Sequence, residues 1–186
     1  ENIFKDNLGI LTKNANVADA LEPEEAKEAA TFWITNPNNR FIGNAAAGSE
    51  GSGFWLIPVT RVLRAGAKPN SYSPRKFPLL EFDGNRAHSN SKRGIMIEGD
   101  MKRSDRSVTI NNQHPLLDVN GDTLRHVFRN FTTFKSRNCI WTRGSVNNIF
   151  INGSVGEGNF MAFLSFNALV RNTLFVARNE NTGPEN

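Results

Sequence analysis

The stretch that decides the fold is Asn44-Ala-Ala-Ala-Gly-Ser-Glu-Gly-Ser-Gly-Phe-Trp-Leu56, because its pattern returns as Asn85-Arg-Ala-His-Ser-Asn-Ser-Lys-Arg-Gly-Ile-Met-Ile97. Each copy has Asn, then Ala two residues later, then polar residues, a Gly and an apolar run. Each copy also follows a Phe-x-Gly. A weaker third copy begins at Phe128-Arg-Asn130 and ends in Cys139-Ile-Trp141. Self-similarity of this kind is the signature of a solenoid.

The composition favours many tight corners. The 186 residues include 25 Asn and 15 Gly, and both residue types adopt the left-handed backbone conformation that a sharp corner needs. Stacked corners also allow Asn side chains to form ladders. Apolar runs this short, separated by single corners, suit a solenoid better than a sandwich with its longer strands and hairpins. We therefore predict an all-β fold, a right-handed, single-stranded parallel β-helix.

Residues 1–186 are predicted to form one β-helix segment with three excursions. The first, at about 15–30, has Pro23 and an acidic first turn, so we expect a short surface helix with a solvated charge run. The other two, at about 58–80 and 98–117, are basic loops over the outer face. Because the strand pattern is already present at Ile3 with no polar cap before it, we expect the segment to belong to a larger protein.

The spacing of the Asn corners predicts the length of a coil. From Asn44 to Asn85 is 41 residues, which we interpret as about two coils including the excursion. Asn130, Asn152 and Asn172 are 22 and 20 residues apart, which is the length of a single coil.

Charge and composition limit the classes of partner. The net charge is +4 and the pI is about 9.5, which permits an acidic polysaccharide, a nucleic acid or an anionic lipid surface, although on charge alone plain solubility is the favoured explanation. Only the pI favours a nucleic acid, so none is expected. No apolar run is long enough to span a membrane, and we expect no membrane contact from this segment. The single Cys139 is predicted to be a buried apolar residue, and the three His have no paired metal-binding spacing.

The second copy of the pattern offers the most polar surface. Alternation along a strand would place Arg86, His88 and Asn90 on one face, beside the corner residue Asn85. Guanidinium, imidazole and amide groups suit a carboxylate-bearing sugar. The alternative is that Asn85 and His88 stabilise the corner through hydrogen bonds to the backbone.

Other candidates are weaker. Trp141 and Arg143 could form an aromatic platform beside a cation, although a Trp within Cys-Ile-Trp is more often in the core. Trp33 and Trp55 are expected to face the core or to stack. The acids nearest the repeats are Glu50, Glu81, Asp83, Glu98 and Asp100. The sequence alone defines no distance between any two of them, so it neither supports nor excludes a two-carboxylate glycosidase site.

Two sequons could carry N-linked glycans, Asn130-Phe-Thr132 and Asn152-Gly-Ser154. Asn130 lies between Phe128 and Phe131 and is expected to be buried. Asn152 is therefore the better glycosylation site.

The quoted motifs resemble those of a known family. Thr31-Phe-Trp-Ile-Thr-Asn-Pro-Asn-Asn39, Asn44-Ala-Ala-Ala-Gly-Ser-Glu50 with Gly53-Phe-Trp55, Asn85-Arg-Ala-His-Ser-Asn90 and Asn172-Thr-Leu-Phe-Val176 look like the β-helical region of the cell-migration-inducing hyaluronidase (CEMIP-like) family. The first of these motifs is also similar, more distantly, to fibrocystin-type proteins.

This resemblance implies a parallel β-helix in an extracellular or cell-surface glycoprotein that binds and depolymerises hyaluronan. It implies an endo-acting glycosidase-type hydrolase, with calcium as the only cofactor suggested and the N- and C-terminal parts of the same protein as further partners. The fibrocystin branch supports the alternative of a structural or adhesive solenoid without catalysis. The catalytic residues are not identified by the resemblance.

Overall fold

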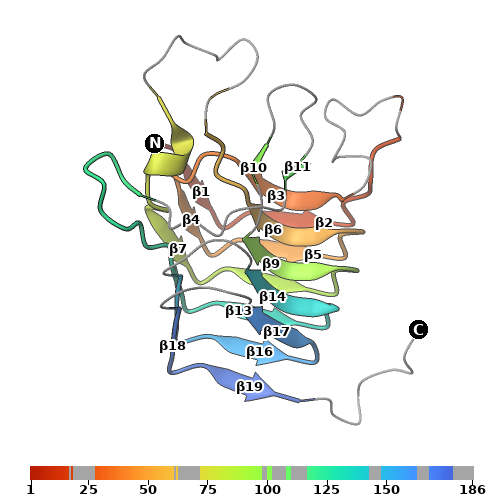
Figure 1. Ribbon diagram of the computed structural model, residues 1–186. Coiled ribbons are helices and arrows are strands. Elements are labelled where there is room, and N and C mark those ends of the chain that lie inside the picture. Colours follow the sequence, from red (N-terminus) through yellow and green to blue (C-terminus); the bar gives the residue numbers. More distant parts are fainter. Residues whose placement is uncertain are drawn as a thin grey trace.

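A computed structural model describes residues 1–16, 18, 28–60, 62, 72–97, 100–101, 108–109, 117–142, 148–162 and 168–177. Three parallel sheets run along the length of the molecule, with the strands of successive coils stacked on one another (Figure 1). The N-terminal coil lies at one end of the stack and β19 (Leu174–Val176) at the other.

Each sheet collects the equivalent strand of every coil. Sheet A contains β1 (Ile3–Lys5), β4 (Arg40–Ile42), β7 (Glu81–Asp83), β12 (Val127–Arg129), β15 (Ile149–Ile151) and β18 (Leu169–Arg171). Sheet B contains β2 (Leu8–Ile10), β5 (Ala45–Ala47), β8 (Arg86–His88), β13 (Thr132–Phe134), β16 (Ser154–Gly156) and β19. Sheet C contains β3 (Ala30–Ile34), β6 (Ser52–Leu56), β9 (Arg93–Ile97), β14 (Asn138–Thr142) and β17 (Asn159–Ala162).

The prediction of a parallel β-helix is confirmed. The chain visits sheets A, B and C in turn, and every pairing within the three sheets is parallel. The register joins equivalent residues of the repeat, so that Phe41 pairs with Phe82 and Ala46 pairs with Ala87. The interpretation of 41 residues as about two coils is wrong, because β4–β6 and β7–β9 are consecutive coils separated by the excursion after Leu56. The spacings of 22 and 20 residues do correspond to single coils.

Left-handed residues turn the chain between sheets A and B. The residue after each sheet A strand has positive φ; the six are Asp6, Gly43, Gly84, Asn130, Asn152 and Asn172. Five of the six are Gly or Asn, at φ values of 48° to 66°, and the sixth is Asp6 at 54°. Gly, and next to it Asn and Asp, are the residue types that enter this region most readily. The richness of the sequence in Asn and Gly therefore has a local conformational cause.

The core is a column of stacked side chains inside the coil. The middle residue of the first five sheet A strands is Phe, and Phe41, Phe82, Phe128 and Phe150 are each at most 3% exposed. The ring centroids of Phe82 and Phe128 are 5.0 Å apart, and so are those of Phe128 and Phe150. Rings at this distance bury large apolar areas and also interact through their quadrupoles.

A second inward column lies at the corner between sheets A and B. Asn44 donates from Nδ2 to Oδ1 of Asn85 at 2.9 Å, and its backbone N–H donates to the same oxygen at 2.9 Å. Asn85 in turn donates from Nδ2 to the carbonyl oxygen of Phe41 at 2.8 Å. Asn7 extends the ladder by donating to Oδ1 of Asn44. Buried amides therefore satisfy both each other and the corner backbone.

This amide ladder ends in the fourth coil, where Phe131 occupies the position of Asn85. The next coil has Gly153 at the same position, and a Cβ added there would overlap the ring of Phe131. A large side chain in one coil is thus accommodated by a missing side chain in the next.

The excursions can be compared with the prediction only in part. Most of the helix expected at about 15–30 lies outside the described residues, and Ala30 already belongs to β3. In the second excursion the structure shows a short 3₁₀ helix, Pro74–Lys76. In the third, β10 (Asp100–Met101) pairs antiparallel with β11 (Val108–Thr109).

Candidate functional site

One candidate surface, which we name the Arg86 face, consists of the outward residues of β8 and β13: Arg86, His88, Thr132 and Phe134. Ala87 and Thr133 point inward and are fully buried, so alternation turns their neighbours to the outside. The imidazole of His88 stacks on the phenyl ring of Phe134, with centroids 4.6 Å apart and an interplanar angle of 10°. Arg86 is exposed and, within the described part of the chain, forms no ion pair.

Small residues flank the ring pair along the sheet. Ala47 pairs with His88 from the coil before, and Gly156 pairs with Phe134 from the coil after. Beside them, the hydroxyl of Ser154 lies 3.3 Å from that of Thr132. The Arg86 face therefore combines a guanidinium, two hydroxyls and an aromatic stack with no bulky neighbour on either side. The sequence analysis did not identify Phe134 as a residue of this surface. Its equivalence to His88 in the repeat is the signal that could have revealed it.

The other two residues predicted for this surface lie inside the coil. Asn85 is 1% exposed and Asn90 is 2% exposed. Oδ1 of Asn90 accepts the backbone N–H of Ser49 at 3.0 Å, so Asn90 is a second corner amide. The prediction that Asn90 shares a face with Arg86 and His88 is wrong, because the left-handed Ser89 interrupts the alternation. Of the two residues in the alternative interpretation, Asn85 stabilises its corner, whereas the partner of Nδ1 of His88 is a side chain, with Oγ of Ser89 at 3.2 Å.

Both sequons lie at left-handed corners on the surface. Asn130 is exposed, and its Nδ2 donates to Asp83 at 2.7 Å, so the expectation that it is buried is wrong. Its neighbours Phe128 and Phe131 are buried, but the positive φ of Asn130 turns its side chain away from them. Asn152 is also exposed, and its Oδ1 accepts from Asn172 at 3.3 Å.

The outer face of sheet C carries an aromatic column. Trp33 and Trp55 stack on neighbouring strands, with centroids 6.1 Å apart, which confirms that they stack with each other. Met96 and Trp141 follow in register on β9 and β14. Trp141 is half-buried against this cluster. The cation beside the Trp141 ring is Arg93, whose guanidinium carbon lies 5.0 Å from the ring centroid. Arg143, which the sequence predicted for that role, lies outside the described residues.

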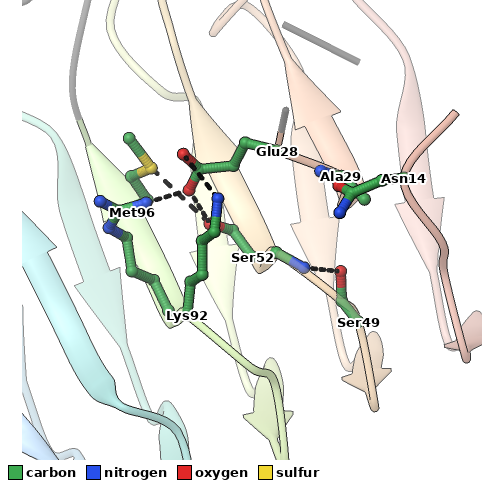
Figure 2. A network of polar contacts seen from close by, with 9 residues as sticks. Asn14, Glu28, Ala29, Ser49, Ser52, Lys92 and Met96 are labelled. Carbon is green, nitrogen blue, oxygen red and sulfur yellow. Dashed lines mark hydrogen bonds and ion pairs between the residues drawn. The ribbon is translucent and has the colours of Figure 1, made fainter. Parts of the chain in front are cut away.

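Glu28, which lies just before β3 in the first coil, links that coil to the second and third coils. Its carboxylate forms an ion pair with Arg93, lies 3.8 Å from Nζ of Lys92 and accepts from Oγ of Ser52 at 3.2 Å. Figure 2 shows the side chain of Glu28 reaching toward Ser52 and Lys92. The expectation of a solvated charge run is therefore wrong for Glu28, whose side chain is only 14% exposed. The sequence does not reveal this pairing, because Glu28 and Arg93 are 65 residues apart.

A cavity of about 200 Å³ lies next to this network. We name it the Trp33 cavity; it is lined by Thr12, Lys13, Ala15, Glu28, Ala29, Ala30, Trp33 and Trp55. Oγ1 of Thr12 lies 2.9 Å from Oγ1 of Thr31, and Asn14 ties the rim together by accepting the N–H of Ala29 at 2.7 Å. The cavity therefore combines indole surface, a hydroxyl and charges of both signs.

Two buried titratable groups belong to the fold. Burial lowers the pKa of His126 to about 4, and its Nδ1 accepts the backbone N–H of Leu79 at 3.1 Å. Burial raises the pKa of the Cys139 thiol, which is fully buried as predicted. A neutral imidazole and a neutral thiol of this kind are structural groups rather than nucleophiles.

Comparison with known proteins decides the family. The family model described as the CEMIP β-helix matches residues 1–95. The mouse "Cell migration-inducing and hyaluronan-binding protein" is 31% identical over 189 residues, which cover 87% of this chain. The chain belongs to the CEMIP β-helix family.

Other relatives of this CEMIP β-helix chain extend the comparison. The zebrafish "Cell surface hyaluronidase" is 27% identical over 98% of the chain, and mouse "Fibrocystin-L" is 33% identical over 52% of it. The chain spans 14% of the length of the mouse hyaluronan-binding protein, 16% of the zebrafish protein and 2% of Fibrocystin-L.

The calcium that the family resemblance suggested can be tested against this CEMIP β-helix. Among the described residues, no three His, Cys, Asp or Glu side chains come close enough together to hold one ion. Calcium is held by six to eight oxygen ligands, backbone and Asn carbonyls among them, and the described residues offer no cluster of three carboxylates to anchor such a set. In the same part of the chain, no helix is long and apolar enough to cross a bilayer.

Proposed function

We propose that this chain is the part of a cell-surface or secreted protein that binds an acidic polysaccharide, hyaluronan, through the Arg86 face. The observation that carries the proposal is an exposed guanidinium beside a stacked His88–Phe134 pair, in a chain whose relatives are named for hyaluronan. Guanidinium groups bind carboxylates with two parallel hydrogen bonds. Aromatic rings offer a flat apolar surface to the C–H face of a sugar.

The repeat of the fold suits a polymer. Neighbouring strands of a sheet lie roughly 4.8 Å apart, so Arg86, Thr132 and Ser154 present one polar group per coil along one line. A polysaccharide lying along the solenoid axis would meet these groups one after another. The net charge of +4 adds a long-range attraction for an anionic chain.

Depolymerisation is the finer part of the proposal and concerns the whole protein. Four of the described carboxylates are engaged within the fold: Glu28 by Arg93, Glu81 by Arg40, Asp83 by Asn130 and Glu157 by Lys135. A glycosidase needs one carboxylic acid and one free carboxylate across the scissile bond. We therefore expect this chain to bind hyaluronan and the full-length protein to cleave it.

The experiment compares binding with cleavage. The chain and the full-length protein are incubated separately with hyaluronan of defined length, and the products are sized on a gel. We expect shortening with the full-length protein only. Failure of both to shorten hyaluronan would remove the enzymatic part of the proposal. Binding is measured in parallel by calorimetry, with Arg86→Ala as the test variant and Arg129→Ala, an exposed arginine on sheet A, as its matched control.

A non-catalytic structural or adhesive solenoid is the second candidate. The match to Fibrocystin-L favours it, and so does the engagement of Glu28, Glu81, Asp83 and Glu157 within the fold. Under this alternative the chain binds no hyaluronan, and Arg86→Ala behaves like Arg129→Ala in every assay.

Other parts of the same protein are proposed as partners at the two ends of the stack. The end coils expose apolar residues that face the core elsewhere, with Phe4 39% exposed and Phe175 51% exposed. Solenoid ends of this kind need a cover. A longer piece of the natural protein should therefore unfold at a higher temperature than this chain, and an equal or lower unfolding temperature would contradict the proposal.

A further inference from the structure

The Trp33 cavity has the features of a ligand site that the Arg86 face lacks. It is concave, it lies on a different sheet, and at about 200 Å³ it is smaller than the roughly 300 Å³ of ordinary small-molecule pockets. A space of this size admits one ring rather than the interior of a polymer. An occupant must therefore enter as an end group.

The apolar wall selects a flat ring. Trp33 is half-buried and lines the cavity, whereas Trp55, one coil along, is 2% exposed and supports it through the stack. Trp55 packs against Met96 and Ile57, so the ring on which the indole of Trp33 stacks is itself fixed in place. A preorganised indole of this kind loses little entropy when a ring packs on it.

The polar wall selects the charge of the ligand. Lys13 lines the cavity, is exposed, and forms no ion pair with any described residue. The carboxylate of Glu28 is already engaged by Arg93, Lys92 and Ser52. Among the described residues near the cavity, Lys13, Lys92 and Arg93 stand against Glu28 and Glu50, the second of which accepts the N–H of Asn14 at 2.9 Å. One net positive charge remains, on the side of the unpaired Lys13, and it favours an anionic group. The hydroxyl of Thr12 supplies a hydrogen-bonding partner for a sugar hydroxyl.

We propose that the Trp33 cavity binds the terminal sugar of an anionic oligosaccharide, with the ring packed on Trp33 and its carboxylate beside Lys13. The identity of the sugar as part of hyaluronan rests on the proposed function, whereas the size, the indole wall and the positive charge come from the cavity itself. The Arg86 face and the Trp33 cavity then differ in what they recognise. The first binds the length of a polymer and the second binds its end.

The experiment uses probes that separate these two sites. The probes are a hyaluronan tetrasaccharide with a uronate at its non-reducing end, long hyaluronan and cellotetraose, a neutral oligosaccharide of similar size. Binding is followed by calorimetry and by tryptophan fluorescence, because two of the three Trp of the chain line the cavity. We expect the tetrasaccharide to cause a saturable fluorescence change and cellotetraose to bind at least roughly fivefold more weakly, since it lacks the charge.

Variants assign the binding to the cavity. Trp33→Ala should weaken tetrasaccharide binding roughly tenfold, the loss expected for one aromatic contact. Lys13→Met keeps the aliphatic stem and should weaken it roughly threefold with a smaller dependence on salt. Lys76→Met, an exposed lysine on the 3₁₀ helix, and Trp141→Phe, outside the cavity, are the matched controls and should bind normally. Circular dichroism checks that each variant is folded, and Lys13→Met remains informative if Trp33→Ala is not.

The outcomes separate this proposal from the one before it. If the tetrasaccharide does not bind, or binds equally well to Lys13→Met and the wild type, the cavity proposal is overturned even if long hyaluronan still binds. A second outcome is that tetrasaccharide binding depends on Trp33 and Lys13 while the binding of long hyaluronan does not depend on Arg86. The cavity proposal then stands, and the proposal that the Arg86 face binds the polymer is wrong.

Discussion

Asn85 and Arg86 are neighbours in the chain, yet they belong to regions with opposite properties. Asn85 is an inward corner residue at 1% exposure, and its side chain accepts two hydrogen bonds from Asn44 and donates one to Phe41. Arg86 points outward from the same coil and has no ion-pair partner among the described residues. The comparison teaches that inward positions of a coil are constrained by the coils beside them, whereas outward positions are available for a ligand.

Replacing Asn85 with Ala should have the largest effect on stability. The change removes the acceptor for the backbone N–H and Nδ2 of Asn44 and the donor for the carbonyl of Phe41, all of them buried. Unpaired buried groups cost about 1–3 kcal/mol each, so we expect the free energy of unfolding to fall by about 3 kcal/mol. Urea unfolding followed by circular dichroism measures this. A loss below about 1 kcal/mol would mean that the ladder does not constrain the inward column.

Acid should weaken the inward region through His126. The pKa of His126 is about 4 in the folded chain, whereas a histidine free of such burial, as in the unfolded chain, has a pKa of 6.5. Above pH 6.5 both states hold it neutral; as the pH falls from 6.5 toward 4, only the unfolded state takes up the proton, so stability is lost across that window. The full loss is roughly 3 kcal/mol at 1.36 kcal/mol per pKa unit.

Unfolding curves of the wild type and of His126→Asn between pH 7 and pH 4 measure this effect. The Asn side chain can still accept the N–H of Leu79 but does not titrate. Its stability should therefore depend less on pH than that of the wild type. Equal slopes for the two proteins would show that His126 is not responsible.

Two glycines test the difference between inward and outward positions of a coil. Gly153→Ala places a methyl group against the ring of Phe131 and should cost about 2 kcal/mol, as overpacking of a core does. Gly156→Ala, three residues later on the outward side, would meet Cβ of Phe134 at 3.6 Å and Cβ of Val176 at 3.7 Å, which is ordinary contact. It should leave stability unchanged or raise it slightly. Thermal unfolding of both variants tests this, and similar losses would contradict the distinction.

The sequence predicted the coil more completely than the surface. Phe and Asn at equivalent places, such as Phe82 and Asn85, reveal the fold because stacking repeats one environment in every coil. Asn90 was assigned to the wrong face because Ser89 adopts a left-handed conformation without being Gly or Asn. The contact between Glu28 and Arg93 could not be predicted, since it joins an excursion to a strand two coils away. Nor could the cavity, which depends on which side chains leave a space unfilled.

The central claim is that the inward column builds the solenoid and the Arg86 face binds the polymer. The most direct test measures hyaluronan affinity and thermal unfolding together for Arg86→Ala, with Arg129→Ala as the control. We predict that Arg86→Ala unfolds at the wild-type temperature and binds long hyaluronan roughly tenfold more weakly, as expected for losing one guanidinium–carboxylate contact. Wild-type affinity in Arg86→Ala, or an equal loss in Arg129→Ala, would contradict the account.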